Sequence, residues 1–449
     1  MTTLDQKEEK KFNWSIVGLI IILAVFLFYS VYLAMNLKTG IIPDEPYRYE
    51  VSRYFSQTWG IPKDVPLAIE YGDNLSRTPF LGYWIFGRII NVISWVAPES
   101  TDFQQLVWVR IMNGLFALGT LIFTYLLSRE LIKNNWLQIL PVFFLANTMM
   151  FVFLAGGVNY DNPTNLFCVM GIYFLVRVLN DKHFLSNSCG WLISFMIASL
   201  IKYAILPLIL FTAVIWVIYV IKHKGILGSL KPARWQQYLL IAVVAILFVG
   251  NLMLYGRNLL EFQSLTPNCD DTYSQEVCQE SVFFLRYKEL GLPEKLSILG
   301  AFKQGYPEPV RYLFEVWIPE MLARIFGIMG HLTYYPIVIS YFQIAFYWLI
   351  FLGFRYIEKP GFRSITLSVL LVAYAAVLFV MNYDNELVYG FKQVAFQGRY
   401  FFPVISLAFV MVTKLLAHVD NKYLRYGTII ALVLLFLYGG PFRFFWYGC

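Results

Sequence analysis

Charged residues are scarce in this sequence, since Asp, Glu, Lys and Arg make up only 14% of its 449 residues. Soluble domains carry about 25%, so the surface of an ordinary cytosolic enzyme of this size would be poorly hydrated. The sequence also has no low-complexity linker and no basic tract, because its Lys and Arg residues are scattered between apolar runs. The composition therefore excludes a disordered chain, a collagen, a coiled coil and an ordinary cytosolic enzyme, and it gives no support to nucleic-acid binding.

Long apolar runs are what the sequence has in place of charge, with 59% hydrophobic and 18% aromatic residues. A membrane-crossing helix needs about 20 apolar residues, because the hydrocarbon core is ~30 Å thick and each residue rises ~1.5 Å. We therefore predict an all-α polytopic membrane protein with about eleven transmembrane helices. The expected spans are 14–35, 107–128, 136–156, 163–180, 189–201, 203–221, 237–256, 336–354, 365–382, 400–417 and 426–446. The first is read as a retained anchor, and the two around Lys202 are either two short helices or one broken helix.

The distribution of Lys and Arg in the short loops predicts the orientation. An N-terminus inside the cell places the loops rich in Lys and Arg inside and leaves the loop 157–162, which has neither, outside. The same topology puts two long segments outside, 36–106 and 257–335, and we expect them to contain helices lying in the membrane interface. An odd number of spans puts the C-terminus outside. The predicted organisation is an N-terminal transmembrane module (1–256), an outer segment (257–335) and C-terminal transmembrane helices (336–449).

Two cysteines, Cys269 and Cys278, lie in the polar part of the second outer segment. A disulfide can persist outside the cell, and we favour that pairing. A metal site is the alternative, although no histidine stands beside the two cysteines.

A pair of acids stands just beyond the first span, in Pro43-Asp44-Glu45-Pro46. Flanking prolines predict a stiff, non-helical corner, and repulsion between adjacent carboxylates raises the pKa of one of them. Such a pair suits a general base near the outer membrane surface. A solvated acidic turn is the alternative interpretation.

Other polar residues fall on the same predicted side of the membrane. Lys202 stands between apolar stretches and either binds a phosphate or extends to the interface. Arg399, which follows Gln397 and precedes Tyr400, either grips a phosphate through paired hydrogen bonds or anchors a helix end. Gly398 between them permits close backbone approach.

The turn at 159–163 offers further polar groups. Asn162 and Pro163 are expected to be the N-cap and first residue of a helix, which leaves Asp161 and its neighbour Tyr160 as candidate substrate contacts. His331 is a lone histidine that is either structural or substrate-binding. Together these groups describe an outer site for transferring something from a phosphate-linked lipid.

The order of these motifs resembles the GT-C superfamily of polytopic glycosyltransferases, and most closely a largely uncharacterised bacterial membrane family within it. The resemblance rests on Pro-Asp-Glu-Pro at 43–46, Asn-Pro at 162–163, Lys202, Phe-Gly-Ile-Met-Gly at 326–330 with Pro336, and Gln-Gly-Arg-Tyr-Phe-Phe-Pro at 397–403. It departs from the family's pattern at Tyr47-Arg48, where Ala-His is usual, and in Asn159-Tyr160-Asp161, which bear on the choice of sugar or acceptor.

The resemblance implies inverting glycosyl transfer from a polyprenyl-phosphate sugar to a cell-surface glycan or another envelope acceptor. Asp44 is then the catalytic base, with Glu45 orienting the acceptor or sharing the proton. Lys202 and Arg399 neutralise the donor phosphate, and the substrate contacts are Tyr160, Asp161, Gln397, Tyr400 and His331.

The implied partners are the lipid-linked donor, the glycan acceptor and membrane lipids, in a bacterial inner membrane with the active site facing the periplasm. No cofactor is implied, and no metal ligand is assigned, although a divalent metal at the acidic pair stays open. No nucleotide-sugar motif or Rossmann unit is present, which fits a lipid-borne donor. A transporter or flippase of lipid-linked glycans is the alternative function, and a glycan polymerase or a non-catalytic partner is less favoured.

Overall fold

The computed structural model describes residues 13–63, 65–223, 225–226, 228, 231–232, 234–290, 295–329, 333–334, 336–356, 361–390 and 396–443. In the first half, the helices are α1 (Trp14–Asn36), α2 (Glu45–Ser56), α3 (Pro66–Glu70), α4 (Leu81–Val96), α5 (Asp102–Leu131), α6 (Asn135–Ala146), α7 (Met149–Ala155), α8 (Asp161–Val178), α9 (Phe184–Ile201), η1 (Tyr203–Ile205) and α10 (Leu206–Lys222).

The second half begins with α11 (Trp235–Asn251), the π-helical turn η3 (Leu252–Gly256) and α12 (Arg257–Phe262). Short helices follow: α13 (Cys269–Thr272), α14 (Gln275–Glu280), α15 (Val282–Leu290), α16 (Ile298–Gln304), α17 (Pro309–Tyr312), η4 (Leu313–Trp317), α18 (Ile318–Leu322) and η5 (Ala323–Gly327). The chain then forms α19 (Pro336–Arg355), α20 (Phe362–Tyr389), η7 (Gly398–Phe401), α21 (Phe402–Ala417) and α22 (Lys422–Gly439). Two-residue strands, β1 (Ile328–Met329) and β2 (Thr333–Tyr334), pair antiparallel, and every other regular element of the described residues is helical.

The described residues contain nine helices long and apolar enough to cross a membrane, or up to ten if the bent pair α6 and α7 counts as one span. The expected all-α polytopic architecture is confirmed, and the nine or ten candidate spans of the described residues compare with about eleven predicted. The predicted span 163–180 corresponds to α8, which is helical but falls outside that count because its first turn carries Asp161, Asn162, Thr164 and Asn165.

Two breaks interrupt the helices, one inside the predicted span 136–156 and one at Lys202, where the hydropathy pattern had left the number of helices open. The axis bends by 68° between α6 and α7, where the Thr148 hydroxyl donates to the carbonyl of Phe144 at 2.8 Å. At Lys202 the backbone is extended, with φ −151° and ψ 123°, so the apolar stretch around it forms two separate helices.

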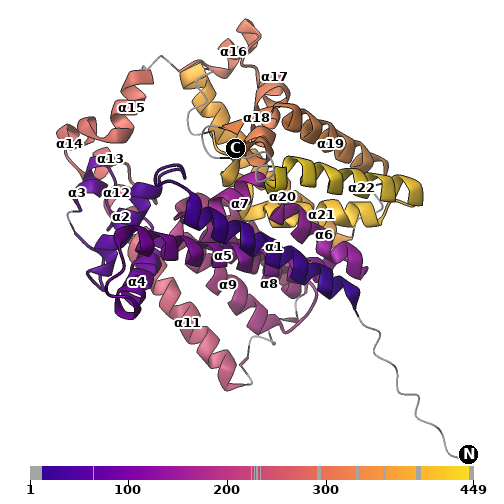
Figure 1. Ribbon diagram of the computed structural model, residues 1–449, viewed down its shortest axis with the longest axis horizontal. Helices are drawn as coiled ribbons and strands as arrows, with labels where there is room; N and C mark the ends of the chain where they lie inside the picture. Colours follow the sequence, from indigo (N-terminus) through magenta and orange to yellow (C-terminus); the bar gives the residue numbers. More distant parts are fainter. Residues whose placement is uncertain are drawn as a thin grey trace, which may run out of the picture.

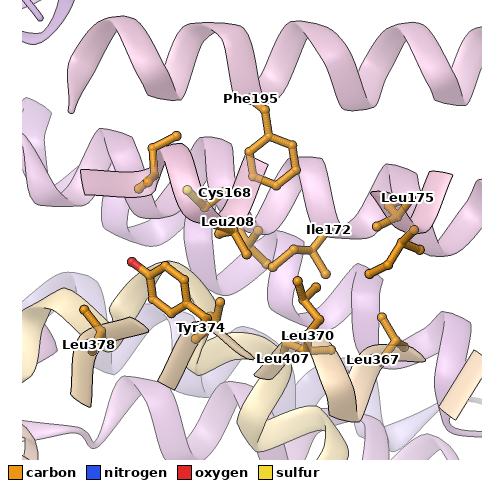
Figure 2. Packing of buried hydrophobic residues seen from close by; sticks show 14 of the residues in the cluster. Cys168, Ile172, Leu175, Phe195, Leu208, Leu367, Leu370, Tyr374, Leu378 and Leu407 are labelled. Carbon is orange, nitrogen blue, oxygen red and sulfur yellow. The ribbon is translucent and has the colours of Figure 1, made fainter. Parts of the chain in front are cut away.

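The helices pack around a buried centre formed by α8. Figure 2 shows its residues Cys168, Ile172 and Leu175 in one apolar layer with residues of α9, α10, α20 and α21. Helices at the periphery instead expose large apolar side chains, including Ile20, Leu210, Ile246 and Ile344. Such exposure is expected where the solvent of the helix is lipid.

The two segments predicted to lie outside contact each other. Figure 1 shows α3 of the first segment beside α13 and α14 of the second. Cys269 and Cys278 form a disulfide in the second segment, and a Cβ on Gly72 of the first would lie 3.3 Å from the Cys269 sulfur. Arg77 and Glu261 join the two segments by an ion pair of 2.5 Å. The first segment also contains α4, an apolar helix too short to span.

Candidate functional site

Asp44 begins the site at the turn that leads from α1 into α2. Its backbone is left-handed, with φ 59°, a conformation that short polar residues tolerate best among the non-glycine types. Pro46 stands in the first turn of α2, where its fixed φ suits a helix start. The Asp44 carboxylate does not cap the helix and is 49% exposed, so it is held out from the helix end and stays accessible.

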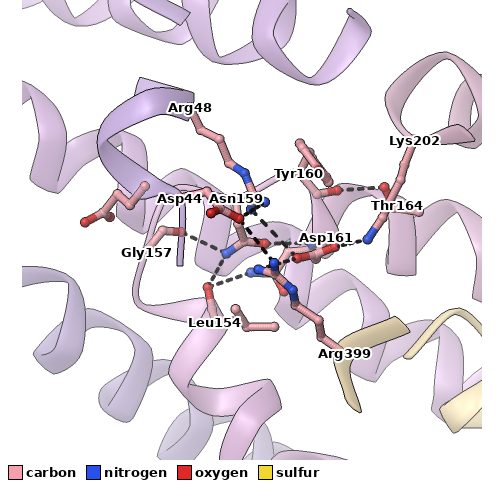
Figure 3. Close-up of polar contacts among 12 residues, drawn as sticks. Asp44, Arg48, Leu154, Gly157, Asn159, Tyr160, Asp161, Thr164, Lys202 and Arg399 are labelled. Carbon is pink, nitrogen blue, oxygen red and sulfur yellow. Dashed lines mark hydrogen bonds and ion pairs between the residues drawn. The ribbon is translucent and has the colours of Figure 1, made fainter. Parts of the chain in front are cut away.

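Two arginines from distant parts of the sequence contact one oxygen of Asp44 (Figure 3). Arg48, one turn later on α2, donates to Oδ2 at 2.9 Å. Arg399, in η7, donates to the same oxygen at 3.2 Å. Both arginines are buried, with side-chain exposures of 3% and 7%, so their charges act on Asp44 with little screening by water.

A second carboxylate, Asp161, lies behind these arginines at the start of α8. Lys202 contacts its Oδ1 at 2.5 Å. The Nη1 atoms of Arg399 and Arg48 lie 3.5 Å and 3.8 Å from its Oδ2. Asp44, Arg48, Asp161, Lys202 and Arg399 thus form one group, here called the charged cluster.

The charged cluster has more positive than negative groups. Three cations face two carboxylates, which leaves a net charge of +1. Within the described part of the chain, Nη1 of Arg48 and both Nε and Nη1 of Arg399 are buried without a hydrogen-bond acceptor. Because buried donors without a partner are costly, the arrangement fits an anion with several acceptor oxygens, such as a phosphate.

Aromatic rings wall the charged cluster. The guanidinium of Arg48 lies 4.0 Å from the centre of the Tyr160 ring. The ammonium of Lys202 lies 4.6 Å from the Tyr400 ring and 5.2 Å from the Tyr160 ring. Cation–π contacts of this kind fix cations without neutralising them, so both rings hold the charges in place for another partner.

The pKa of Asp44 differs from the expectation of mutual repulsion between adjacent acids. Burial raises this pKa, but the positive charges of Arg48 and Arg399 outweigh it and hold the pKa below its ordinary value. Asp44 is therefore ionised at neutral pH and able to accept a proton.

Glu45 belongs to a closed pair with Arg110, and its described hydrogen bonds and ion pair include no member of the charged cluster. The Nε and Nη2 atoms of Arg110 donate to its two oxygens at 2.8 Å and 2.6 Å, and the backbone N–H of Val158 adds a third hydrogen bond at 2.9 Å. Both side chains are fully buried. Arg110 also donates to the carbonyls of Ala34 and Leu37, so the pair ties α1, α2 and α5 to the turn before α8.

The turn before α8 corrects one expectation. Helix α8 begins at Asp161 after Tyr160, so Asn162 lies inside the helix and is not its N-cap. The side-chain oxygen of Asn159 accepts from the Asn162 N–H at 3.1 Å and takes over the capping. The side chains of both asparagines donate to the carbonyl of Leu154, which fixes the turn that carries Tyr160 and Asp161.

The residues around Arg399 lie against η5. A Cβ on Gly398 would come within 2.9 Å of the Arg324 carbonyl carbon, which agrees with the expected close backbone approach. Gln397 is partly buried, with extended backbone before η7, and the Tyr400 carbonyl accepts from the Tyr374 hydroxyl at 3.1 Å. His331 lies outside the described residues.

Sequence reasoning missed Arg48 and Arg110 as functional groups. Arg110 had a usable signal, since it stands inside a predicted span, where a charge requires a partner. Arg48 was noted only as a departure from the family's pattern. The described residues contain no group of three or more His, Cys, Asp or Glu side chains placed to hold a metal.

No family model matches this sequence, and no curated protein matches it. Its fold is similar to the crystal structure of ArnT from Cupriavidus metallidurans bound to undecaprenyl phosphate, with a TM-score of 0.52 and 14% identity over 94% of this chain and 63% of that one. The apo state of the same ArnT gives 0.47 and 12% over 93% of this chain and 63% of that one. This chain thus spans 63% of the ArnT length. The likeness confirms the predicted all-α polytopic fold, whereas the GT-C superfamily and the narrower bacterial family stay predictions.

Proposed function

We propose that this protein is a membrane glycosyltransferase that moves a sugar, with inversion, from a polyprenyl-phosphate donor to a cell-surface glycan or another envelope acceptor. The observation that carries the proposal is the charged cluster, in which a half-exposed carboxylate stands beside buried cations with unused hydrogen-bond donors. A base next to a phosphate site is what this reaction requires. The solved structure with the same fold is described as bound to undecaprenyl phosphate.

In the proposed reaction, Asp44 takes the proton of the acceptor hydroxyl as that oxygen attacks the anomeric carbon of the sugar. The new carbon–oxygen bond forms while the bond from that carbon to the phosphate oxygen breaks, and its electron pair leaves with the polyprenyl phosphate. One displacement inverts the anomeric centre, so the reaction needs one base and no second nucleophilic carboxylate.

Lys202 and Arg399 are proposed to neutralise the charge that grows on the leaving phosphate. Charge stabilisation by groups already in place is a large term in a partly dry site. Asp161 holds these cations within reach of one another. Tyr160, Gln397, Tyr400 and His331 remain proposed substrate contacts.

Glu45 is proposed to act as a positioning residue. Both of its oxygens accept hydrogen bonds from Arg110, and its described partners include no member of the charged cluster. Its contribution is then to hold the turn that presents Asp44. We place the reaction on the outer face of a bacterial inner membrane, with the N-terminus in the cytoplasm and no cofactor.

A transfer assay tests the proposal. Purified protein in liposomes would receive a panel of polyprenyl-phosphate sugars and a crude cell-envelope glycan fraction, and release of polyprenyl phosphate would be measured. We expect release by the wild type and its loss in Asp44→Asn, with donor binding retained. Full turnover by Asp44→Asn would exclude Asp44 as the base. Movement of labelled lipid across the bilayer without consumption of donor would support a flippase instead.

A further inference from the structure

The two arginines that contact Asp44 are held in different ways. Arg48 is on the same helix as Asp44, contacts it at 2.9 Å and is stacked on Tyr160. Arg399 comes from η7, contacts Asp44 at the longer distance of 3.2 Å and has two nitrogens without a hydrogen-bond acceptor among the described residues. Arg48 also has one nitrogen, Nη1, without a hydrogen-bond acceptor among the described residues. Its contact with Asp44 is shorter and the Tyr160 ring holds its guanidinium, so Arg399 has the larger unused binding capacity.

We propose that Arg399 is shared between Asp44 and the donor phosphate, so that donor binding frees the carboxylate to accept a proton, while Arg48 stays on Asp44 as a positioning residue. This inference rests on the proposed function, because the anion is taken to be the phosphodiester of a lipid-linked sugar.

The charges that face Asp44 explain the coupling. Arg48 from α2 and Arg399 from η7 stabilise its ionised form, whereas Asp161 from α8 disfavours it, and Lys202 after α9 lies on the far side of Asp161. A phosphodiester carries one negative charge, which equals the excess positive charge of the cluster. When Arg399 turns to the phosphate, Asp44 loses part of the positive field that stabilises its ionised form.

The consequence is a base whose strength depends on the donor. Without donor, both arginines keep the pKa of Asp44 low and the carboxylate is a weak proton acceptor. With donor bound, the burial of Asp44 and the nearby Asp161 act against a single arginine, and the proton affinity of Asp44 rises. The acceptor hydroxyl is then deprotonated only when a donor sugar is in place for it to attack.

Proton uptake on donor binding tests this coupling. The probe is a polyprenyl methyl phosphodiester, which has no sugar to transfer and does not titrate near pH 4. Calorimetry at about pH 4, close to the ordinary pKa of Asp, in two buffers of different ionisation enthalpy gives the number of protons taken up. We expect net uptake by the wild type and none by Asp44→Asn.

Three variants separate the two arginines. Arg399→Gln is expected to bind the probe more weakly and to lose the uptake, and Arg399→Lys provides the same test with the charge kept if the first variant does not fold. Arg48→Gln is expected to keep the uptake, with its maximum at higher pH, while turnover falls. Arg53→Gln, on the same helix as Arg48 and paired with Glu50 at the surface, is the matched control. It should change neither the proton uptake nor the turnover.

The outcomes distinguish this inference from the function on which it rests. Binding and sugar transfer by the wild type without proton uptake would overturn the sharing of Arg399 alone. Uptake that survives in Arg399→Gln but disappears in Arg48→Gln would also overturn it, because the roles would be reversed. Absence of both probe binding and sugar transfer would overturn the proposed function, and this inference with it.

Discussion

Asp44 and Glu45 are neighbours in the sequence but have opposite environments. Asp44 is half exposed and lies at the edge of the charged cluster, where three cations outnumber two carboxylates. Glu45 is fully buried, and one arginine satisfies both of its oxygens. The difference separates a group that is still able to react from one whose bonding capacity is used. A fully buried carboxylate with both oxygens bound to one arginine has little capacity left to accept a proton, whereas Asp44 keeps about half of its side chain exposed.

Removal of the reactive carboxylate of Asp44 is expected to have the largest effect. Asp44→Asn keeps the size of the side chain but cannot take a proton, so we expect turnover to fall about 10²–10⁴-fold, the usual contribution of a general base. Steady-state kinetics of donor consumption measures the effect. The variant should fold with a modestly lower thermal midpoint, because Asn cannot pair as an ion with Arg48 and Arg399, and a collapse of the fold would contradict a mainly catalytic role.

Breaking the closed pair should affect stability. Arg110→Met leaves Glu45 buried without a cation, and we expect a loss of about 3–5 kcal/mol in the free energy of unfolding. Denaturant titration in detergent measures it. The double variant Glu45→Gln with Arg110→Met should recover part of the loss, because no uncompensated charge remains. Loss of turnover in Arg110→Met with unchanged stability would instead place this pair in the reaction.

Lys202 tests whether the charged cluster binds the donor. Lys202→Gln removes a charge-assisted contact worth about 1.5–3 kcal/mol, which corresponds to a donor affinity about 10- to 150-fold weaker. A binding titration with polyprenyl phosphate measures the change, and its dependence on salt should decrease with the lost charge. Lys222→Gln, at the C-terminal end of α10, is the control and should bind normally.

The smallest expected effect is on the pH dependence. Arginine charges lower the pKa of Asp44 in the folded protein. Its ionised form and its ion pairs are therefore fully present above the ordinary pKa of Asp, and they are lost only as the pH falls through the lowered pKa. The ratio kcat/KM for the donor should therefore show no ionisation of Asp44 between about pH 5 and 8. A fall of kcat/KM on the acidic side of that range would show that the arginines do not keep Asp44 ionised in the free enzyme.

Much of the architecture could be predicted from the sequence. Apolar runs of about 20 residues identify helices in lipid because length and hydropathy are local properties. The predicted span 163–180 is the helix α8, whose buried polar first turn keeps it outside the nine candidate spans of the described residues. The role of Asn162 was also misassigned, because the capping oxygen comes from Asn159, three residues earlier.

The site was predictable in part. Asp44, Asp161, Lys202 and Arg399 were identified singly, each as a polar group where one is costly or exposed, and the structure brings these four together. Arg48 gave little signal, since an arginine in a polar segment has many possible roles. The separate fate of Glu45 could not be predicted, because its partner Arg110 is 65 residues away.

The sequence by itself determined that this chain folds as helices in a membrane and that its few charges require partners. Both follow from the cost of placing polar groups in hydrocarbon, which each segment meets independently of the others. Only the tertiary structure decided which charges meet, because an ion pair depends on distances of a few ångströms between segments hundreds of residues apart. Asp44 and Arg399 are 355 positions apart in the sequence. Helix packing brings them into contact, and the same packing leaves Asp44 accessible while it buries Glu45.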